Sequence, residues 1–426
     1  MSDWQPLKIA DLGRVVTGKT PPTESVEYYD GDELFVSPRD LTWNSYYVDS
    51  TATRISEKAL DKFKGQVIPR DAVMFTSLSF AFGKMGIASC SCITNQQINS
   101  IVVNDKHCAR FVYYLLRAYE PYIFAYNSGI DTPIVPKSVF ERIPVLVPLK
   151  AAQEKIASLL SMYDDLIANN QRRIALLESM AEEIYREWFV RMRFPTHATM
   201  KGDELTPPGW SRQPIGELAV LIKRGISPDY AEQSEHHVIN QKCIRGGRVS
   251  MAEARPHVSV VPDDKLLRSG DVLINSTGVG TLGRAAVFDI EADGVTCDSH
   301  VTILRPKDVA LSGEFLAYTI QLLQPFFESM ASGSTGQAEL SRELISRTKV
   351  LVPTSDLLKR FSDAAAPIRR KRRLLLAQNE KLSVMRNQLL PRLISGKLRV
   401  EALDIQFPPS MQQPPVEAAQ REAIAR

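Results

Sequence analysis

Residues 151–191, AAQEKIASLLSMYDDLIANNQRRIALLESMAEEIYREWFVR, contain neither glycine nor proline. One set of positions in this stretch recurs with alternating spacings of four and three, and apolar residues occupy all of them except Asn170: Ile156, Leu160, Tyr163, Ile167, Asn170, Ile174, Leu177, Ala181, Ile184 and Trp188. A mean repeat of 3.5 residues predicts a helix whose apolar face, called the seam below, packs against another helix. At 1.5 Å per residue the helix would be roughly 60 Å long, so it needs a long partner.

A second stretch near the C-terminus repeats this spacing and supplies the partner. Its seam positions are Phe361, Ala365, Ile368, Arg372, Leu375, Asn379, Leu382, Arg386, Leu389 and Leu393. Pro367 predicts a kink here, which weakens the prediction for the two positions before it, Phe361 and Ala365. Each helix leaves the end of one domain and must reach towards the start of the other, so we expect an antiparallel pair.

Each seam contains one amide, and the two amides predict how the seams are aligned. Several antiparallel registers, seven residues apart, satisfy the apolar spacing. One of them places Asn170 opposite Asn379 and Ile167 opposite Leu382. A buried amide without a partner costs roughly 1–3 kcal/mol, so this matched register is favoured. A paired asparagine typically fixes register at some cost in stability.

The rest of the chain repeats itself with an offset of about 200–206 residues. The run Trp4…Ile9-Ala-Asp-Leu12 recurs as Trp210…Ile215-Gly-Glu-Leu218. The run from Asp71 to Gly83-Lys84 recurs from Asp271 to Gly283-Arg284, and Asn95-Gln-Gln-Ile98 falls opposite Asp298-Ser-His-Val301. Short β-rich runs and one helix recur in each copy, so we predict an α+β fold with two repeated mixed domains separated by two long antiparallel coiled-coil helices. The predicted parts are a first domain (1–148), a long helix (149–192), a linker (193–209), a second domain (210–353), a second long helix (354–400) and a disordered tail (401–426).

Composition places the chain among ordinary proteins of two or three domains. Hydrophobic residues make up 44% and charged residues 24% of the 426 residues. No apolar run is long enough for a membrane span, and the N-terminus lacks a signal-peptide pattern, so we expect no membrane association and a cytoplasmic location. Five cysteines without zinc-site spacing predict reduced thiols and no metal.

Charge is distributed unevenly along the chain. Residues 354–400 contain 12 Lys or Arg against 3 Asp or Glu, whereas the two domain segments have net charges of −1 (1–148) and −3 (201–353). The basic run Arg369-Arg-Lys-Arg-Arg373 is compatible with a solvated face, or with binding to phosphate or an acidic partner. We expect Arg369, Arg370 and Arg373 to make such contacts.

The catalytic motifs that we sought are either absent or out of context. Gly13-Arg-Val-Val-Thr-Gly18-Lys19-Thr20 satisfies the Walker A pattern of nucleotide-hydrolysing enzymes, but Pro21-Pro22 follows where a helix should begin. A P-loop-like NTPase that uses Gly13–Thr20 is therefore the alternative hypothesis. A coiled-coil scaffold without a role in DNA binding is a third one. No methyltransferase, metalloprotease or hydrolase motif was found, which predicts a chain that is not an enzyme.

Polar loops at matching places in the two copies are the candidate binding residues. Arg and Lys pair with guanine, Asn and Gln pair with adenine, and Ser and Thr pair with either base. The candidate DNA-binding residues are Arg39, Thr76, Ser77, Ser79 and Lys84 in the first copy, and Gln241, Lys242, Arg245, Asn275, Ser276, Thr277 and Arg284 in the second.

Several runs in this order resemble the specificity subunit of type I restriction–modification systems. They are Glu187-Trp-Phe-Val190, Pro208-Gly-Trp210, Asn240-Gln-Lys-Cys-Ile-Arg245, Cys297-Asp-Ser-His-Val301 and Leu389-Leu-Pro-Arg-Leu-Ile-Ser-Gly-Lys-Leu398. The resemblance covers about residues 4–400.

The resemblance implies a DNA-recognition subunit. Each target-recognition domain would read one half of a split, asymmetric site in double-stranded DNA, and the helices would set the spacer and dock two methyltransferase subunits. Adenine-N6 methylation and ATP-driven cleavage would belong to the methyltransferase and restriction subunits. The resemblance also implies that S-adenosylmethionine, ATP and Mg are bound by these partners, and that this chain binds no cofactor.

Overall fold

The computed structural model describes residues 4–42, 46–78, 81–128, 132–195, 206–278, 280–290, 293–330 and 339–411. The chain forms two compact units. The first comprises Met1–Arg172 together with Leu375–Arg426, and the second is Arg173–Leu374. Each unit is described by itself.

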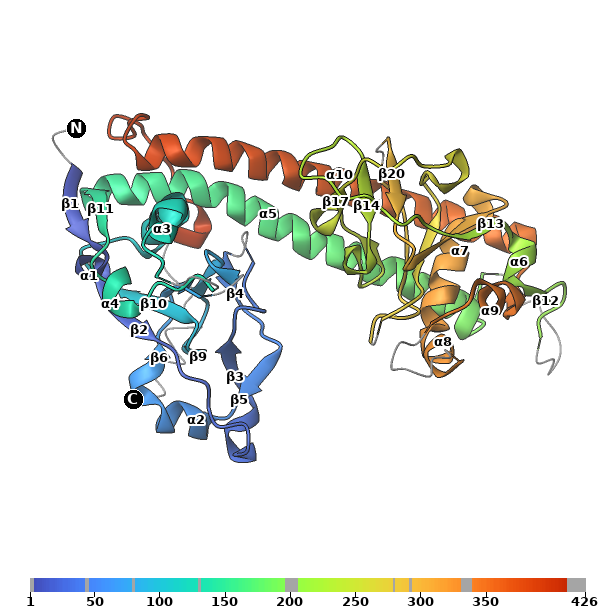
Figure 1. Cartoon of the computed structure of the whole chain (residues 1–426), viewed down its shortest axis with the longest axis horizontal. Coiled ribbons are helices and arrows are strands. Elements are labelled where there is room, and N and C mark those ends of the chain that lie inside the picture. Colours follow the sequence, from blue (N-terminus) through green and yellow to red (C-terminus); the bar gives the residue numbers. More distant parts are fainter. Residues whose placement is uncertain are drawn as a thin grey trace. The chain divides into compact units, whose positions relative to one another are not determined.

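Two long helices pass through both units (Figure 1). Helix α5 spans Lys150–Tyr185 and continues into a π-helical turn, Arg186–Val190, while helix α10 spans Ser355–Ile394. The predicted fold class, two mixed domains with two long antiparallel helices, is confirmed.

The mixed α/β domain of the first unit has two sheets and a short two-stranded base. Strand β1 (Trp4–Lys8) pairs antiparallel with β11 (Pro144–Pro148) at the base, next to helix α1 (Ile9–Leu12). One sheet has the order β2 (Gly13–Thr17), β10 (Ile98–Val103), β7 (Val73–Thr76), β8 (Met85–Ala88) and β4 (Tyr47–Val48). The other has the order β5 (Thr53–Ile55), β3 (Tyr29–Val36), β9 (Cys92–Thr94) and β6 (Val67–Ile68). The helices are α2 (Glu57–Lys62), α3 (Ala109–Phe124) and α4 (Lys137–Phe140).

The second unit repeats this plan. Strand β12 (Ser211–Pro214) pairs with β22 (Lys349–Val352), next to helix α6 (Ile215–Leu218). The main sheet has the order β13 (Ala219–Arg224), β21 (Val301–Pro306), β18 (Val272–Asn275) and β19 (Ala285–Val287). Strands β17 (Arg255–Pro256), β14 (His237–Ile239) and β20 (Val295–Cys297) form another sheet, and β15 (Ile244–Arg245) pairs with β16 (Arg248–Val249). The helices are α7 (Val309–Leu322), α8 (Gln324–Met330) and α9 (Arg342–Arg347).

In each unit the mixed α/β domain is joined to the long helices by one continuous core. In the first unit, Phe111 and Leu115 of α3 share a core with Ile156 and Leu160 of α5 and Leu393 of α10. In the second unit, Phe315 of α7 shares a core with Tyr185, Phe189, Phe361 and Ala365. We expected Pro367 to make Phe361 and Ala365 doubtful as seam positions, and this expectation is wrong. Helix α10 is helical through Pro367, and both side chains are at most 2% exposed.

The helices pair in the predicted register within the first unit. Asn170 is 4% exposed, and its Nδ2 donates to Asn379 Oδ1 at 2.9 Å and to Gln378 Oε1 at 3.3 Å. Asn379 Nδ2 in turn donates to the carbonyl of Ile167 at 3.5 Å. The two amides therefore satisfy each other inside the seam, as the sequence predicted.

A buried ion pair that the sequence analysis missed lies two turns away. Asp164 and Arg386 are 3% and 1% exposed and form an ion pair across the two helices. The Tyr114 hydroxyl of α3 donates to Asp164 Oδ2 at 2.5 Å, so the pair also contacts the mixed α/β domain of the first unit. Burial raises the pKa of Asp164, and Arg386 and the Tyr114 hydrogen bond oppose that shift.

The predicted disorder of the tail is wrong for its first part. Lys155 Nζ donates to the carbonyls of Glu401 and Leu403 at 2.8 and 2.9 Å, and Ile405 and Met411 pack on the first core. This part of the tail is mostly polar, and its apolar residues Ile405 and Met411 attach it to the core that α5 shares. Residues 412–426 lie outside the described residues. Within the described part of the chain, no helix is long and apolar enough to cross a membrane.

We predict opposite effects for single and double substitutions in the amide layer. Asn170→Leu should lower the free energy of unfolding by about 1–3 kcal/mol, because Asn379 then lacks its buried partner. Changing both residues to leucine should make the chain more stable than the wild type, because a buried and a half-buried amide are replaced by an apolar contact. Urea unfolding of the full chain measures both changes. Asn169→Leu, at an exposed neighbour, is the control, and a double variant less stable than the single one would contradict the pairing.

Candidate nucleic-acid interface

Both mixed α/β domains contain a hairpin with the same backbone hydrogen bonds. In the first unit, Thr76 N–H donates to Lys84 O at 2.8 Å and Gly83 N–H donates to Thr76 O at 3.0 Å. In the second, Asn275 N–H donates to Arg284 O at 2.9 Å and Gly283 N–H donates to Asn275 O at 2.8 Å. Thr76 is therefore structurally equivalent to Asn275. Aligning the two sequence runs at Asp71 and Asp271 instead pairs Thr76 with Ser276. The two glycines have φ of +80° and +79°, a conformation that favours glycine.

A turn between two strands supports each hairpin in the same way. Ser77 N–H donates to Gln97 O, and Ser276 N–H donates to His300 O, both at 2.9 Å. In each turn an acidic or amide side chain holds the backbone two residues on: Asn95 Oδ1 accepts from Gln97 N–H at 3.0 Å, and Asp298 Oδ1 accepts from His300 N–H at 2.9 Å. Each hairpin (76–84 or 275–284), with its supporting turn (95–97 or 298–300) and the loops beside it, is called a tip below. The two tips have the same backbone hydrogen bonds but different side chains.

Two equivalent glycines let the strands approach beneath these turns. A Cβ on Gly18 would lie 2.1 Å from the carbonyl oxygen of Thr94, and one on Gly225 would lie 1.9 Å from that of Cys297. Residues 13–17 of the Walker-like run form strand β2, and coil rather than a helix follows Gly18. Lys19 Nζ lies over the Phe63 ring, 5.5 Å from its centre. The structure therefore contradicts the P-loop hypothesis, because no helix N-terminus is present to hold phosphate.

Four of the predicted base-reading residues lie inside the domains instead. Thr76, Ser77, Asn275 and Ser276 are at most 5% exposed. Ser77 Oγ accepts from Asn99 at 3.0 Å, Ser276 Oγ lies 2.7 Å from Thr302 Oγ1, and Asn275 Nδ2 donates to Gln241 O at 3.2 Å. These side chains cannot reach a base edge in this conformation. They support the tips, so the prediction that they contact DNA is corrected.

The other predicted residues lie at or near the surface of the tips. Arg39, Lys242 and Arg245 are exposed. Half-buried Lys84 has its Nζ 3.5 Å from Pro38 O, and Arg284 Nη2 donates to Gly280 O at 2.7 Å. Predicted Ser79 lies outside the described residues.

Gln241 and Thr277 contact each other at the second tip. Gln241 Nε2 donates to Thr277 Oγ1 at 2.6 Å, and Thr277 Oγ1 lies 2.9 Å from His300 Nδ1. Both predicted residues are half-buried and take part in a network of polar side chains.

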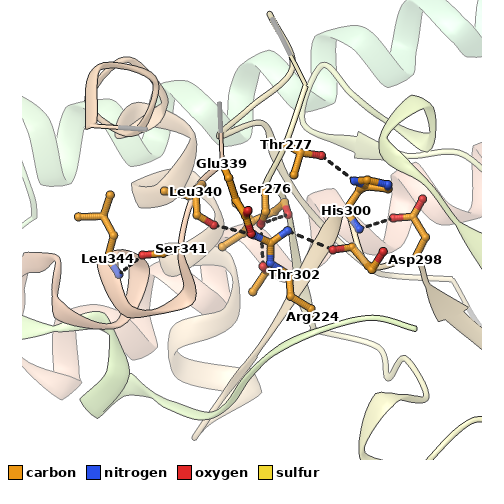
Figure 2. A network of polar contacts seen from close by, with 12 residues as sticks. Arg224, Ser276, Thr277, Asp298, His300, Thr302, Glu339, Leu340, Ser341 and Leu344 are labelled. Atoms are coloured by element: carbon orange, nitrogen blue, oxygen red, sulfur yellow. Dashed lines mark hydrogen bonds and ion pairs between the residues drawn. The ribbon is translucent and has the colours of Figure 1, made fainter. Parts of the chain in front are cut away.

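Figure 2 shows the contact of Thr277 with His300 together with the contacts of Arg224, a residue that was not predicted. Arg224 ends strand β13 and donates to Ser299 O at 3.1 Å, Leu340 O at 2.8 Å and Glu339 Oε1 at 2.9 Å. Burial lowers the pKa of Arg224, and Glu339 opposes that shift. The arginine thereby ties the end of β13 to two loops of the second tip, one containing Ser299 and the other Glu339 and Leu340. The sequence feature that could have indicated a role for Arg224 is its position directly before Gly225. The equivalent glycine of the first domain, Gly18, follows the uncharged residue Thr17.

The basic run of α10 is mostly engaged within the second unit. Arg369 Nη1 lies 2.5 Å from Glu314 Oε1, and Arg372 forms ion pairs with Asp289 and Glu178. Arg369 was expected to contact DNA phosphate or an acidic partner, and within the folded chain it contacts Glu314. The same expectation for Arg370 and Arg373 stays a prediction. Arg370 and Lys371 are the exposed members of the run.

Burial raises the pKa values of cysteine thiols in both domains. It raises the pKa of Cys92 to about 12 and that of Cys243 to about 11, so both stay protonated at neutral pH. Among the described residues, no cluster of His, Cys, Asp and Glu could hold a metal ion.

Comparisons with known proteins agree with this arrangement. Residues 1–179 match the family model described as the type I restriction modification DNA specificity domain. The type I restriction enzyme MjaIX specificity subunit of Methanocaldococcus jannaschii is 25% identical over 421 residues, which cover 94% of this chain and 95% of that protein. The MjaVIII specificity subunit of the same organism is 24% identical over 422 residues, 94% of each protein.

A solved structure shows the same fold. The crystal structure of the type I restriction–modification S subunit from M. genitalium matches with a TM-score of 0.54 and 17% identity, and covers 92% of this chain and 96% of that one. The resemblance to type I specificity subunits that the sequence motifs indicated is confirmed.

Proposed function

We propose that this chain is the DNA-recognition subunit of a type I restriction–modification complex, and that each recognition domain reads one half of a bipartite, asymmetric site. The observation that carries the proposal is the pair of matching tips. Equivalent backbone hydrogen bonds hold different side chains in the two domains, for example Gln97 in one and His300 in the other. Two modules with one geometry and different polar surfaces suit a target with two unlike halves.

The exposed cations of the tips are suited to reading bases. Arg and Lys side chains donate to guanine O6 and N7 in the major groove, and Arg39, Lys242 and Arg245 are free to do so at the surface. Because the domain segments have net charges of −1 and −3, attraction to the DNA backbone would come from elsewhere. Exposed Arg370 and Lys371 of α10 and the partner subunits are the proposed sources.

The long helices would set the spacer and dock two methyltransferase subunits. Exposed apolar side chains support this docking role: Met162 and Leu166 are 42% and 48% exposed in the first unit, and Leu176 and Met180 are 66% and 54% exposed in the second. Adenine-N6 methylation, ATP-dependent cleavage and the sites for S-adenosylmethionine, ATP and Mg are proposed to lie on the methyltransferase and restriction subunits. The complex would act in the cytoplasm.

We expect the two domains to be exchangeable one at a time. Replacing residues 210–353 with the equivalent segment of the MjaIX relative should change one half of the methylated motif and leave the other half intact. Sequencing methylated adenines in cells that express the chimera with the methyltransferase provides the measurement. The reciprocal replacement of residues 4–148 is the control, and a change in both halves after either exchange would contradict two independent modules. Failure of the assembled wild-type complex to shift any DNA fragment would favour the scaffold hypothesis.

Lys242 should contribute to base selection at the second tip. Lys242→Ala should weaken binding of the assembled complex to its target by about 1–3 kcal/mol, which is about 5–150-fold, and relax selectivity at one base pair. Titrating target and mismatched duplexes measures both effects. Lys349→Ala, at an exposed position of strand β22, should bind as the wild type does. An equal loss on all duplexes would instead assign Lys242 to phosphate.

Lengthening both helices together should lengthen the DNA spacer. Seven residues add about 10 Å of helix, so one heptad inserted into α5 and one into α10 beside the Asn170–Asn379 layer should add about three base pairs at 3.4 Å each. The half-site sequences should stay the same, because both tips are unchanged. The methylated motif reports the spacer directly. Insertion into α5 alone mismatches the seams and should abolish methylation, and an unchanged spacer in the double insertion would disprove the role of the helices.

A further inference from the structure

An exposed histidine at the second tip is connected to two half-buried polar side chains. His300 is exposed, whereas Thr277 and Gln241 are half-buried. Thr277 Oγ1 lies 2.9 Å from His300 Nδ1 and accepts a hydrogen bond from Gln241 Nε2 at 2.6 Å. Figure 2 shows the contact between Thr277 and the His300 ring. The three side chains form a relay of hydrogen bonds, called the relay below, which ends at the surface of the domain.

The relay defines which nitrogen of the His300 ring carries a hydrogen. Gln241 Nε2 also donates to the carbonyl oxygen of Thr277, which can only accept, so this atom is the amide nitrogen. Thr277 Oγ1 therefore accepts from it, and the hydroxyl hydrogen remains available for His300 Nδ1. A hydroxyl that accepts one hydrogen bond is a stronger donor in the next. Because His300 Nδ1 then accepts, the neutral ring carries its hydrogen on Nε2.

The ring is held in place and has one donor to spare. Among the described residues, Thr277 is the only hydrogen-bond partner of the His300 ring, so Nε2 is available to a ligand. Asp298 Oδ1 accepts from His300 N–H at 2.9 Å and fixes the backbone. At the other end of the relay, buried Asn275 donates to the carbonyl of Gln241 at 3.2 Å. A side chain locked by its neighbours, with a free donor at the surface, suits base recognition.

The first tip has no such relay at the equivalent place. Leu78 and Thr277 each follow the serine that supports the hairpin, and each forms an antiparallel bridge. Gln97 stands where His300 does, and its Oε1 accepts from Asn95 within the same turn at 3.4 Å. Leucine has no hydroxyl to donate. The hydroxyl therefore occurs in the tip whose exposed side chain is an imidazole, which needs it to fix one tautomer.

We propose that His300 reads a guanine of the second half-site by donating from Nε2 to N7, and that Thr277 and Gln241 are positioning residues that orient the ring. In the major groove, guanine presents N7 and O6 as neighbouring acceptors, whereas adenine has a donor beside its N7 and cytosine presents a donor. Guanine O6 is paired with cytosine, so N7 is the acceptor left for a single donor. This assignment rests on the proposed function, whereas the tautomer is a property of the folded chain.

Modified bases and substitutions test the contact in the assembled complex. Sequencing of methylated adenines defines the second half-site, and duplexes with each base pair changed in turn are then titrated. His300→Ala should reduce the preference at one G·C pair from about tenfold to within about twofold and leave the other pairs unchanged. Replacing that guanine with 7-deazaguanine, which lacks N7, should weaken binding of the wild type about fivefold and leave binding of the His300→Ala complex unchanged.

A double-mutant cycle tests the positioning role. Thr277→Val keeps the shape and removes the hydroxyl, so it should lower the preference at the same base pair about threefold. The double variant should behave as His300→Ala alone, because Thr277 acts only through the ring. His236→Ala and Thr53→Val, at exposed positions, are the matched controls and should stay within about twofold of the wild type on every duplex.

Nitrogen-15 spectra of the full chain, labelled in its histidine rings, test the tautomer without DNA. At about pH 8, where ordinary imidazoles are neutral, the signals that His300→Ala removes should show a protonated Nε2. In Thr277→Val they should move towards an average of both tautomers. A ring protonated on Nδ1 in the wild type would overturn the relay.

Three binding results would overturn the base contact. They are a His300→Ala complex that keeps its preference, one that loses affinity equally on all duplexes, and a 7-deazaguanine effect that is the same with and without His300. Losses that multiply in the double variant would contradict the positioning role of Thr277. If the wild-type complex prefers no DNA sequence, the proposed function fails, and the nitrogen spectra still decide the tautomer.

Discussion

The structure depends on the pairing of two helices that neither recognition domain could bury alone. Helices α5 and α10 contain 36 and 40 residues, and their seams extend through both compact units. An apolar seam of that length allows several registers, so apolar packing alone does not select one. The selection comes from polar groups: Asn170 with Asn379, and Asp164 with Arg386. In each unit the domain then shares its own core with the two long helices.

Spacing patterns revealed the helices, because a 3.5-residue repeat depends only on which positions are apolar. The register followed from one matched amide pair. Other contacts could not be read this way. Nothing local marks Asp164 as the partner of a residue more than 200 positions away, and a proline inside a helix can leave the layers before it intact, as Phe361 shows.

The candidate site was predictable in place but not in detail. Matching the two copies located both hairpins, yet residue type did not tell which polar side chains face inward. Thr76 and Asn275 are buried because the hairpin strands that carry them are covered on both faces, and Arg224 was missed because its partners come from separate loops. Three-dimensional proximity, rather than residue chemistry, separates the supporting residues from the exposed Lys242 and Arg245.

The division of the chain into units has a consequence for biosynthesis. The second unit is one continuous segment, 173–374, whereas the first is closed by residues from 375 onwards. At about 5–20 residues per second, the ribosome needs roughly 10–40 s to make the intervening 200 residues. During that time the early part of α5 lacks the residues of α10 that cover its seam, including Arg386. The nascent chain therefore exposes the uncovered seam of α5 until residues from 375 onwards are translated. Folding of the first unit thus depends on the order in which the chain is synthesised and other subunits bind to it.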